Sequence, residues 1–97
     1  MGQITINPRK LAELIENLTS HKKDLISKNE ELVQIKNRMD MAWEGDSQYN
    51  DVGRPALQRM IKNNEEVVEL LNNTLVGLDS WLGAVQEFVN RRNDGMM

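Results

Sequence analysis

The stretch MAWEGDSQYNDVGRP, residues 41–55, lies close to the middle of the 97-residue chain. It contains one of the two tryptophans, two of the six glycines, the only tyrosine and the second of two prolines. Glycine and proline are the residues that most often interrupt helices, and neither occurs between Arg9 and Trp43. The sequence therefore predicts two helical halves joined by a turn within this stretch.

The first half has the features of one long helix over about residues 8–42. Asn7 can cap this helix with its side-chain oxygen, and Pro8 suits the first helical position, where its missing N–H costs nothing. A seven-residue repeat keeps one stripe of side chains facing a partner helix. The repeat is apolar at Leu11, Leu18, Leu25, Leu32 and Met39. We expect a second row, polar in its middle, at Leu14, His21, Lys28, Ile35 and Ala42.

The second half predicts a helix over about residues 55–92, with a tail over residues 93–97. Three neighbouring rows cover more than about 100° of its surface, which is more than one facing helix can bury. The cheapest way to cover them is to pack two antiparallel hairpins into an all-α four-helix bundle. The rows are Leu57, Asn64, Leu71, Leu78 and Val85; Ile61, Val68, Leu75, Leu82 and Val89; and Met60, Val67, Thr74, Trp81 and Phe88.

Between the helices we expect a turn over residues 43–54. Gly45 permits a positive φ that a side chain would penalise, and Trp43 is expected to cover the end of the hairpin. Pro55 lacks an N–H and disfavours a helical conformation at Arg54. We therefore expect a short helical piece over residues 47–52, a break at Gly53–Arg54, and the main helix from Pro55.

The composition excludes several classes of function. With 39% hydrophobic and 28% charged residues, residues 1–97 form one small domain without an apolar run long enough to span a membrane, so we expect no stable membrane insertion. A net charge of −3 argues against nucleic-acid binding. The absence of cysteine excludes disulfides and thiolate metal sites. The first 20 residues contain no continuous apolar region, so we expect no cleaved signal peptide.

No catalytic pattern is present in the sequence. His21 is the only histidine, and the Glu-x-x-His pairs of a di-metal helical bundle are missing. There is no phosphate-binding glycine loop and no nucleophile motif. We predict a protein that is not an enzyme and that uses no cofactor and no metal.

Four polar residues interrupt the predicted rows, and two interpretations of them stay open. Buried polar side chains in a helical interface set register or partner choice at a cost in stability. The same side chains can instead lie at the edge with their polar ends in solvent. The four are His21, Lys28, Asn64 and Thr74.

Trp43 and Gly45 form a Trp-x-Gly motif at the centre of a chain of about a hundred residues, with one amphipathic helix on each side. These features resemble the WXG family of small ESAT-like proteins, which are exported by type VII (ESX-type) secretion systems. The resemblance covers the whole chain, but only the two motif positions are specific. It implies an antiparallel helical pair that turns at the Trp-x-Gly motif and dimerises into a four-helix bundle.

The resemblance also implies a function. Such a protein is exported from the cytoplasm without a cleaved signal peptide, and acts as a substrate, co-secreted partner or targeting factor in virulence or interbacterial competition. The implied partners are a second copy or a related small helical protein, the secretion machinery and a larger toxin. Trp43 and Gly45 are then the secretion motif. The dimer core is Leu11, Leu18, Leu25, Leu32, Met39, Ile61, Val68, Leu75, Leu82 and Val89.

Two features depart from the family pattern. The family often carries a C-terminal export signal, a Tyr followed four residues later by Asp or Glu, but Tyr49 is followed by Gly53 and Phe88 by Arg92. Trp81 and Phe88 are candidates for a degenerate signal; alternatively, a signal-bearing partner carries the chain. The long turn ending in DVGRP resembles a divergent branch, such as the helical proteins that accompany LXG toxins. The alternative function is a cytoplasmic adaptor or chaperone for a larger secreted toxin.

Overall fold

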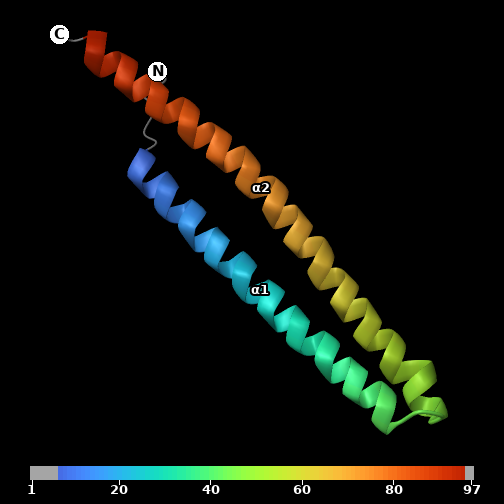
Figure 1. Ribbon diagram of the computed structural model, residues 1–97. Coiled ribbons are helices and arrows are strands. Elements are labelled where there is room, and N and C mark those ends of the chain that lie inside the picture. The colour runs from blue at the N-terminus through green and yellow to red at the C-terminus, as the bar shows by residue number, and fades with distance from the viewer. Residues whose placement is uncertain (1–6, 96–97) are drawn as a thin grey trace.

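The computed structural model describes residues 7–95, with side chains to residue 92, and these residues form a hairpin of two long helices (Figure 1). Helix α1 spans Pro8–Ala42 and helix α2 spans Arg54–Gly95. A short π-helical turn, η1, covers Tyr49–Gly53 and leads into α2. No strand occurs within residues 7–95. The expected all-α hairpin is therefore confirmed.

The beginning of α1 follows from its sequence. The Asn7 side-chain oxygen accepts a hydrogen bond from the Arg9 N–H at 2.9 Å, and Pro8 occupies the first turn. This is the capping arrangement in which proline costs no helical hydrogen bond. The helix ends at Ala42, where the N–H of Trp43 donates to the Met39 carbonyl at 2.9 Å.

The chain between the turn and α2 differs from the expectation. The predicted break at Gly53–Arg54 is wrong, because Arg54 is helical, with φ −61° and ψ −48°, and its N–H donates to the Tyr49 carbonyl five residues earlier. A proline inside an α-helix collides with the carbonyl four residues before it. The wider π-helical turn directly ahead of Pro55 gives the ring room, so the helix continues.

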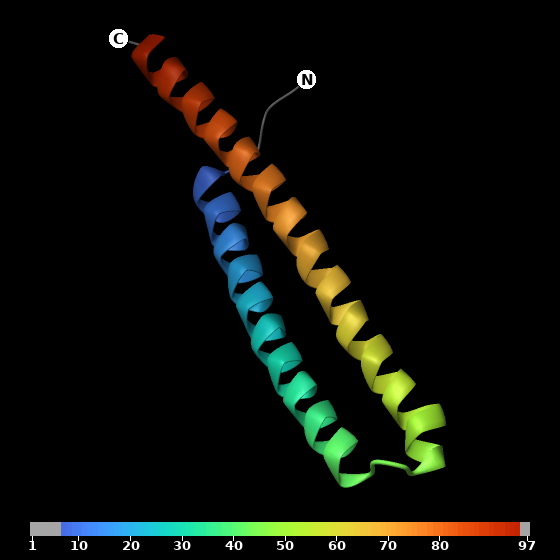
Figure 2. The same ribbon diagram turned by 45° about the vertical axis from the view of Figure 1, so that its right-hand side comes forward.

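The far end of α2 also differs. Helix α2 continues to Gly95, so residues 93–95 are helical where a tail was expected, and residues 96–97 lie outside the described residues. Helix α2 therefore extends past the beginning of α1, as Figures 1 and 2 show. Val89, expected in the core, is 37% exposed because α1 does not reach its level.

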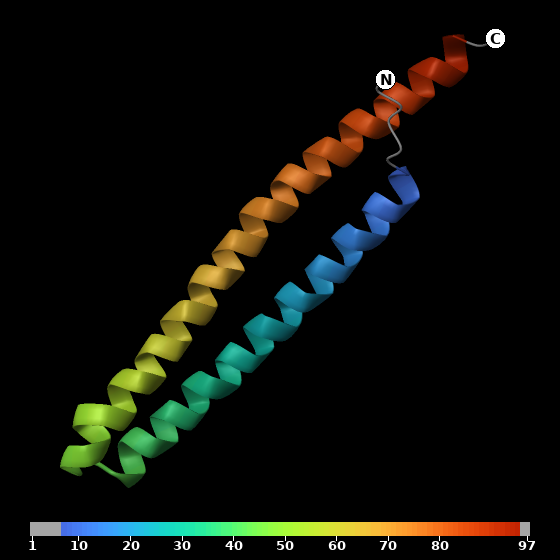
Figure 3. The same cartoon turned by 180° about the vertical axis from the view of Figure 1, so that it is seen from behind.

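The interface between the helices is a single seam of apolar side chains. Leu11, Leu75 and Val85 are buried, with at most 9% of each exposed. Ten further apolar members of the expected rows are half-buried: Leu18, Leu25, Leu32, Met39, Leu57, Ile61, Val68, Leu71, Leu78 and Leu82. Because no third element covers them, most of these side chains keep one side in water. Figure 3 shows the two helices from the back, still side by side along the length of α1.

The second row of α1 was predicted incorrectly. Leu14 and Ile35 are 49% and 47% exposed. The other three residues of that row, His21, Lys28 and Ala42, are exposed as well. The expected row began three residues after Leu11, at Leu14. The row that packs beside the Leu11 row begins four residues after Leu11, at Ile15, and its half-buried members are Ile15, Lys22, Asn29 and Lys36. Both possible rows are polar in the middle, so the sequence pattern did not distinguish them.

A side-chain hydrogen bond crosses the middle of the seam. The Asn64 side-chain amide donates a hydrogen bond to the Asn29 side-chain oxygen at 3.1 Å, and both residues are half-buried. A polar pair of this kind fixes register, because sliding one helix past the other would separate the two amides and leave each without its partner. Of the two interpretations of the polar positions, the register role fits Asn64, whereas His21, Lys28 and Thr74 lie exposed at the edge.

We predict that the Asn29–Asn64 pair contributes to stability only as a pair. Asn64→Leu removes the partner of the half-buried Asn29 amide and should lower the free energy of unfolding by about 1 kcal/mol. Replacing both residues by leucine should recover most of that loss. Urea unfolding followed by circular dichroism, at one fixed protein concentration, measures both effects.

The exposed neighbour Asn63 provides the control, and Asn63→Leu should change the free energy of unfolding by less than about 0.5 kcal/mol. Equal losses in the single and the double variant would show that the asparagines do not act together.

Candidate functional site

The turn is built from a short sequence of capping interactions. Residues 43–45 form the turn, and Gly45 has a φ of +86°, a conformation that favours glycine. The Asp46 N–H donates to the Trp43 carbonyl at 3.1 Å. The Asp46 side chain then accepts a hydrogen bond from the Tyr49 N–H at 2.8 Å and caps the helical segment that follows. The position of Trp43 relative to the second helix is thus determined by backbone geometry at Gly45 and by one carboxylate.

Tyr49 closes the end of the hairpin. Only 4% of Tyr49 is exposed, the lowest fraction among the buried apolar residues. Its hydroxyl donates a hydrogen bond to the Asp40 carboxylate on α1 and lies 3.5 Å from the Lys36 carbonyl oxygen. A Cβ atom at Gly53 would lie 3.0 Å from the Tyr49 ring, so glycine at that position makes room for the ring. Tyr49 therefore ties η1 to the last turns of α1.

Asp40 is the centre of a charged cluster behind Tyr49. Its carboxylate pairs with the Lys36 ammonium at 2.9 Å and with the Arg54 guanidinium at 3.3 Å. The hydrogen bonds from Lys36 and Tyr49, together with the Arg54 charge, hold the pKa of Asp40 below its ordinary value. Burial and the hydrogen bond to Asp40 raise the pKa of Tyr49 above its ordinary value. The cluster thus favours a charged Asp40 and a neutral Tyr49.

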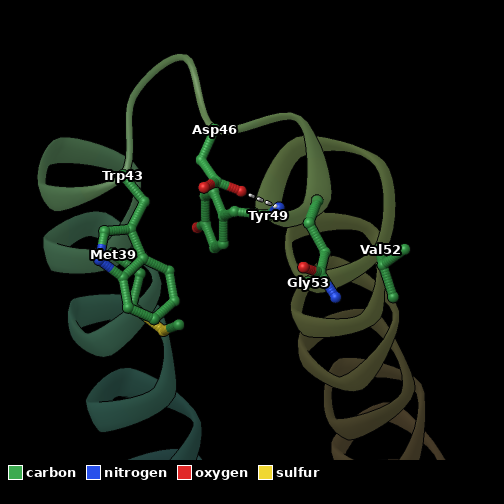
Figure 4. Close-up of a pocket in the computed structure, with 7 residues that line it drawn as sticks. Met39, Trp43, Asp46, Tyr49, Val52 and Gly53 are labelled. Atoms are coloured by element: carbon green, nitrogen blue, oxygen red, sulfur yellow. Dashed lines mark hydrogen bonds between the residues drawn. The ribbon is translucent and has the colours of Figure 1, made fainter.

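Trp43 sits outside this cluster and remains accessible. It is 53% exposed, and its ring meets the Tyr49 ring edge to face, with centroids 5.8 Å apart and an interplanar angle of 79°. Beside the two rings is an open cavity of about 400 Å³ at the tip of the hairpin (Figure 4). The cavity is lined by Met39, Trp43, Asp46, Gln48, Tyr49, Val52 and Gly53.

A second accessible surface runs along the hairpin. In both helices an exposed row begins three residues after a packed row. The row of α1, which is polar in its middle, begins at Leu14 beside Leu11, and the more apolar row of α2 begins at Met60 beside Leu57. A two-fold axis perpendicular to the plane of the two antiparallel helices relates one helix to the other. Rows at equivalent positions of the two helices therefore lie on the same face of the hairpin. We name this surface the open face. Its large apolar members, each 45–52% exposed, are Leu14, Ile35, Met60, Val67, Trp81 and Phe88.

The residues predicted for the dimer core lie, Val89 apart, in the seam within one hairpin. The predicted motif and signal residues are divided between two other places. Trp43 and Gly45 lie at the turn, whereas Trp81 and Phe88 lie on the open face. Phe88 lies near the C-terminal end of α2, and Arg92 follows it in the same helix.

Sequence reasoning missed three residues that matter to the structure: Asp40, Asn29 and Tyr49. The sequence comparison with the family pattern treats Tyr49 only as a possible export-signal tyrosine. The sequence pattern carried no signal for its structural role, which depends on the Asp40 carboxylate and on the space at Gly53.

Comparisons of the chain with protein-family models, with curated proteins and with solved structures found no match. In the part of the chain that the structure describes, no three histidine, aspartate or glutamate side chains group as a metal site would require. None of the helices described is long and apolar enough to cross a bilayer.

The pKa shifts in the cluster predict how stability changes with pH. Because the folded state lowers the pKa of Asp40, this carboxylate stabilises the fold fully above its unfolded pKa of about 4. That contribution is lost as the pH falls through the lower folded value. We expect the difference in unfolding free energy between the wild type and Asp40→Asn to be constant near neutral pH and to shrink below about pH 4. Urea unfolding between acid and neutral pH measures it.

Asp79→Asn, at an exposed carboxylate of α2, is the control and should give a small difference at every pH. A wild-type advantage over Asp40→Asn that persists at the acid limit would contradict the assignment.

Tyr49 affects stability at alkaline pH. Its raised pKa favours the neutral phenol in the fold, so its contribution to stability is present below about pH 10 and is lost as the pH rises through the folded pKa.

Proposed function

We propose that this chain is a non-enzymatic, WXG-like helical protein that acts with a type VII secretion system as an exported substrate, co-secreted partner or targeting factor. The observation that carries the proposal is the half-exposed Trp43 at the tip of a hairpin, two residues before Gly45 with its positive φ. A tryptophan usually gains stability by burial. Its exposure on a well-formed turn favours a role in recognition, because aromatic anchors dominate protein-binding surfaces.

The proposal includes a second hairpin packed on the open face. The chain exposes 7870 Å², whereas a compact protein of its mass exposes about 5,700 Å². The excess of roughly 2,200 Å² per chain is comparable with the area that stable, obligate partners bury. Six large apolar side chains on the open face are each close to half exposed, and covering them would complete a four-helix bundle.

We predict that the purified protein has twice the chain mass of 11.2 kDa when measured by light scattering after size exclusion. Val67→Glu places a charge in the middle of the open face and should weaken the dimer by about tenfold or more, or about 1.4 kcal/mol, because an apolar contact is replaced by a carboxylate that must lose water on association. The matched control, Asn73→Glu, adds the same charge at an exposed position outside this face and should leave the mass unchanged. A wild-type monomer would instead require a different protein as the partner.

Export tests the function itself. In cells that carry a type VII system and this chain, Trp43→Ala should lower the amount in the culture supernatant by about tenfold or more, because a tryptophan at a binding hot spot contributes about 2 kcal/mol or more. The helical circular dichroism spectrum should stay unchanged. Met41→Ala is the control, since Met41 lies two residues away and is 82% exposed.

Three outcomes separate the alternatives. Loss of export in Trp43→Ala with normal export of Met41→Ala supports the secretion motif. Normal export of both variants removes the assigned role from Trp43. Retention of the wild type in the cell, with a larger toxin co-purifying, supports the cytoplasmic adaptor or chaperone instead.

A further inference from the structure

We infer that Tyr49 is a positioning residue for Trp43: it holds the indole in the orientation that a partner recognises at the tip of the hairpin. The inference rests on the proposed function, because it takes Trp43 as the recognition residue. The inference adds Tyr49, from the other side of the turn, to the residues on which recognition depends. It also explains how closure of the hairpin determines the orientation of the Trp43 ring.

The first step is the contact between the two rings. Trp43 ends α1 and Tyr49 begins η1, so their edge-to-face contact at 5.8 Å joins the two sides of the turn. Tyr49 is buried, whereas about half of Trp43 faces solvent. Figure 4 shows the Tyr49 ring on the inner side of the turn. A fixed inner ring therefore supports an accessible outer ring.

The second step is the anchoring of Tyr49 itself. Its hydroxyl binds the Asp40 carboxylate, which Lys36 and Arg54 hold from α1 and α2 at 2.9 and 3.3 Å. Its backbone N–H is held by the Asp46 side chain at 2.8 Å. Three elements thus fix one phenol ring, and the rotamer freedom of Trp43 is restricted through that ring.

The third step is the space that Gly53 provides. A methyl group there would lie 3.0 Å from Cδ1 of Tyr49, so Gly53→Ala must displace the ring without changing any hydrogen-bonding group. Alanine otherwise suits a helix better than glycine. Gly53→Ala is therefore a way to move Tyr49 while its hydroxyl and its aromatic ring are both retained.

The experiment is ¹⁹F NMR of the full chain labelled with 5-fluorotryptophan, which gives one resonance for Trp43 and one for Trp81. Trp81 lies on the open face and is an internal reference in every sample. Tyr49→Leu removes the supporting ring and should shift the Trp43 resonance. Its H₂O/D₂O isotope shift should rise by up to about twofold, since Trp43 is already 53% exposed. The Trp81 resonance should stay in place.

Two further variants separate ring from hydroxyl. Tyr49→Phe keeps the ring, loses the bond to Asp40, and should move the Trp43 resonance less than Tyr49→Leu does. Gly53→Ala should also shift Trp43, and it tests the coupling even if Tyr49→Leu proves too unstable to fold. Met41→Leu, at an 82% exposed position of the same turn, should shift neither resonance.

Export of the same variants completes the test. Reduced export of Tyr49→Leu, with partial or full rescue by Tyr49→Phe and an unchanged helical spectrum, supports the positioning role. An unchanged Trp43 resonance in both Tyr49→Leu and Gly53→Ala overturns it. A shifted resonance with normal export, while Trp43→Ala blocks export, also overturns it, because the orientation of Trp43 would then not matter. Normal export of Trp43→Ala refutes the proposed function instead. The NMR measurement of the Tyr49–Trp43 contact does not depend on that result.

Discussion

Two helices lying side by side can bury only the side chains that face each other across one seam. This constraint determines the burial and the shape of the hairpin. Among the side chains described, only three on the helices are buried, and the remaining apolar positions of the seam are half-buried. A compact protein of this length has a radius of gyration of about 13 Å, whereas the hairpin has 21.7 Å. The open face follows directly, because each helix carries large apolar side chains on a row that the other helix is unable to reach.

The same constraint explains why polar contacts determine the register in which the two helices pack. A narrow apolar seam tolerates sliding, since one leucine replaces another at nearly the same depth. The Asn29–Asn64 pair marks one register in the middle. The cluster around Tyr49 marks it again at the turn, where Asp40 joins α1 to both η1 and α2. The hairpin is thus held in one alignment at two levels along its length.

The sequence was sufficient for the two helices and insufficient for the turn. The repeat of Leu11, Leu18 and Leu25 predicted the inner face of α1, because a seven-residue period has only one structural meaning in a long helix. The second row of α1 was ambiguous, since His21 and Lys28 interrupt one candidate and Lys22 and Lys36 the other. Neither choice could be made without knowing that Asn64 lies opposite Asn29.

The turn depended on interactions that a periodic pattern does not report. The predicted break before Pro55 was wrong because the π-helical turn accommodates the proline ring, and local rules for proline assume α-helical spacing. The burial of Tyr49 depends on Asp40, nine residues earlier, and on the small side of Gly53. The spacing of Trp43 and Gly45 alone identified them as candidate turn residues. It did not identify Tyr49, whose ring contacts Trp43.

The slender outline of the hairpin has a consequence for movement through a confined space. The molecule extends 75 × 23 × 15 Å, so its end-on profile is small for a chain of 97 residues. Helices pack about 8–10 Å apart, so a second hairpin laid on the open face would thicken mainly the thinner side and give a nearly square profile about 25 Å across. Doubling the mass in this way leaves the wider dimension nearly unchanged. A passage entered lengthwise would therefore have to be wider mainly in one direction to admit the pair instead of the single chain.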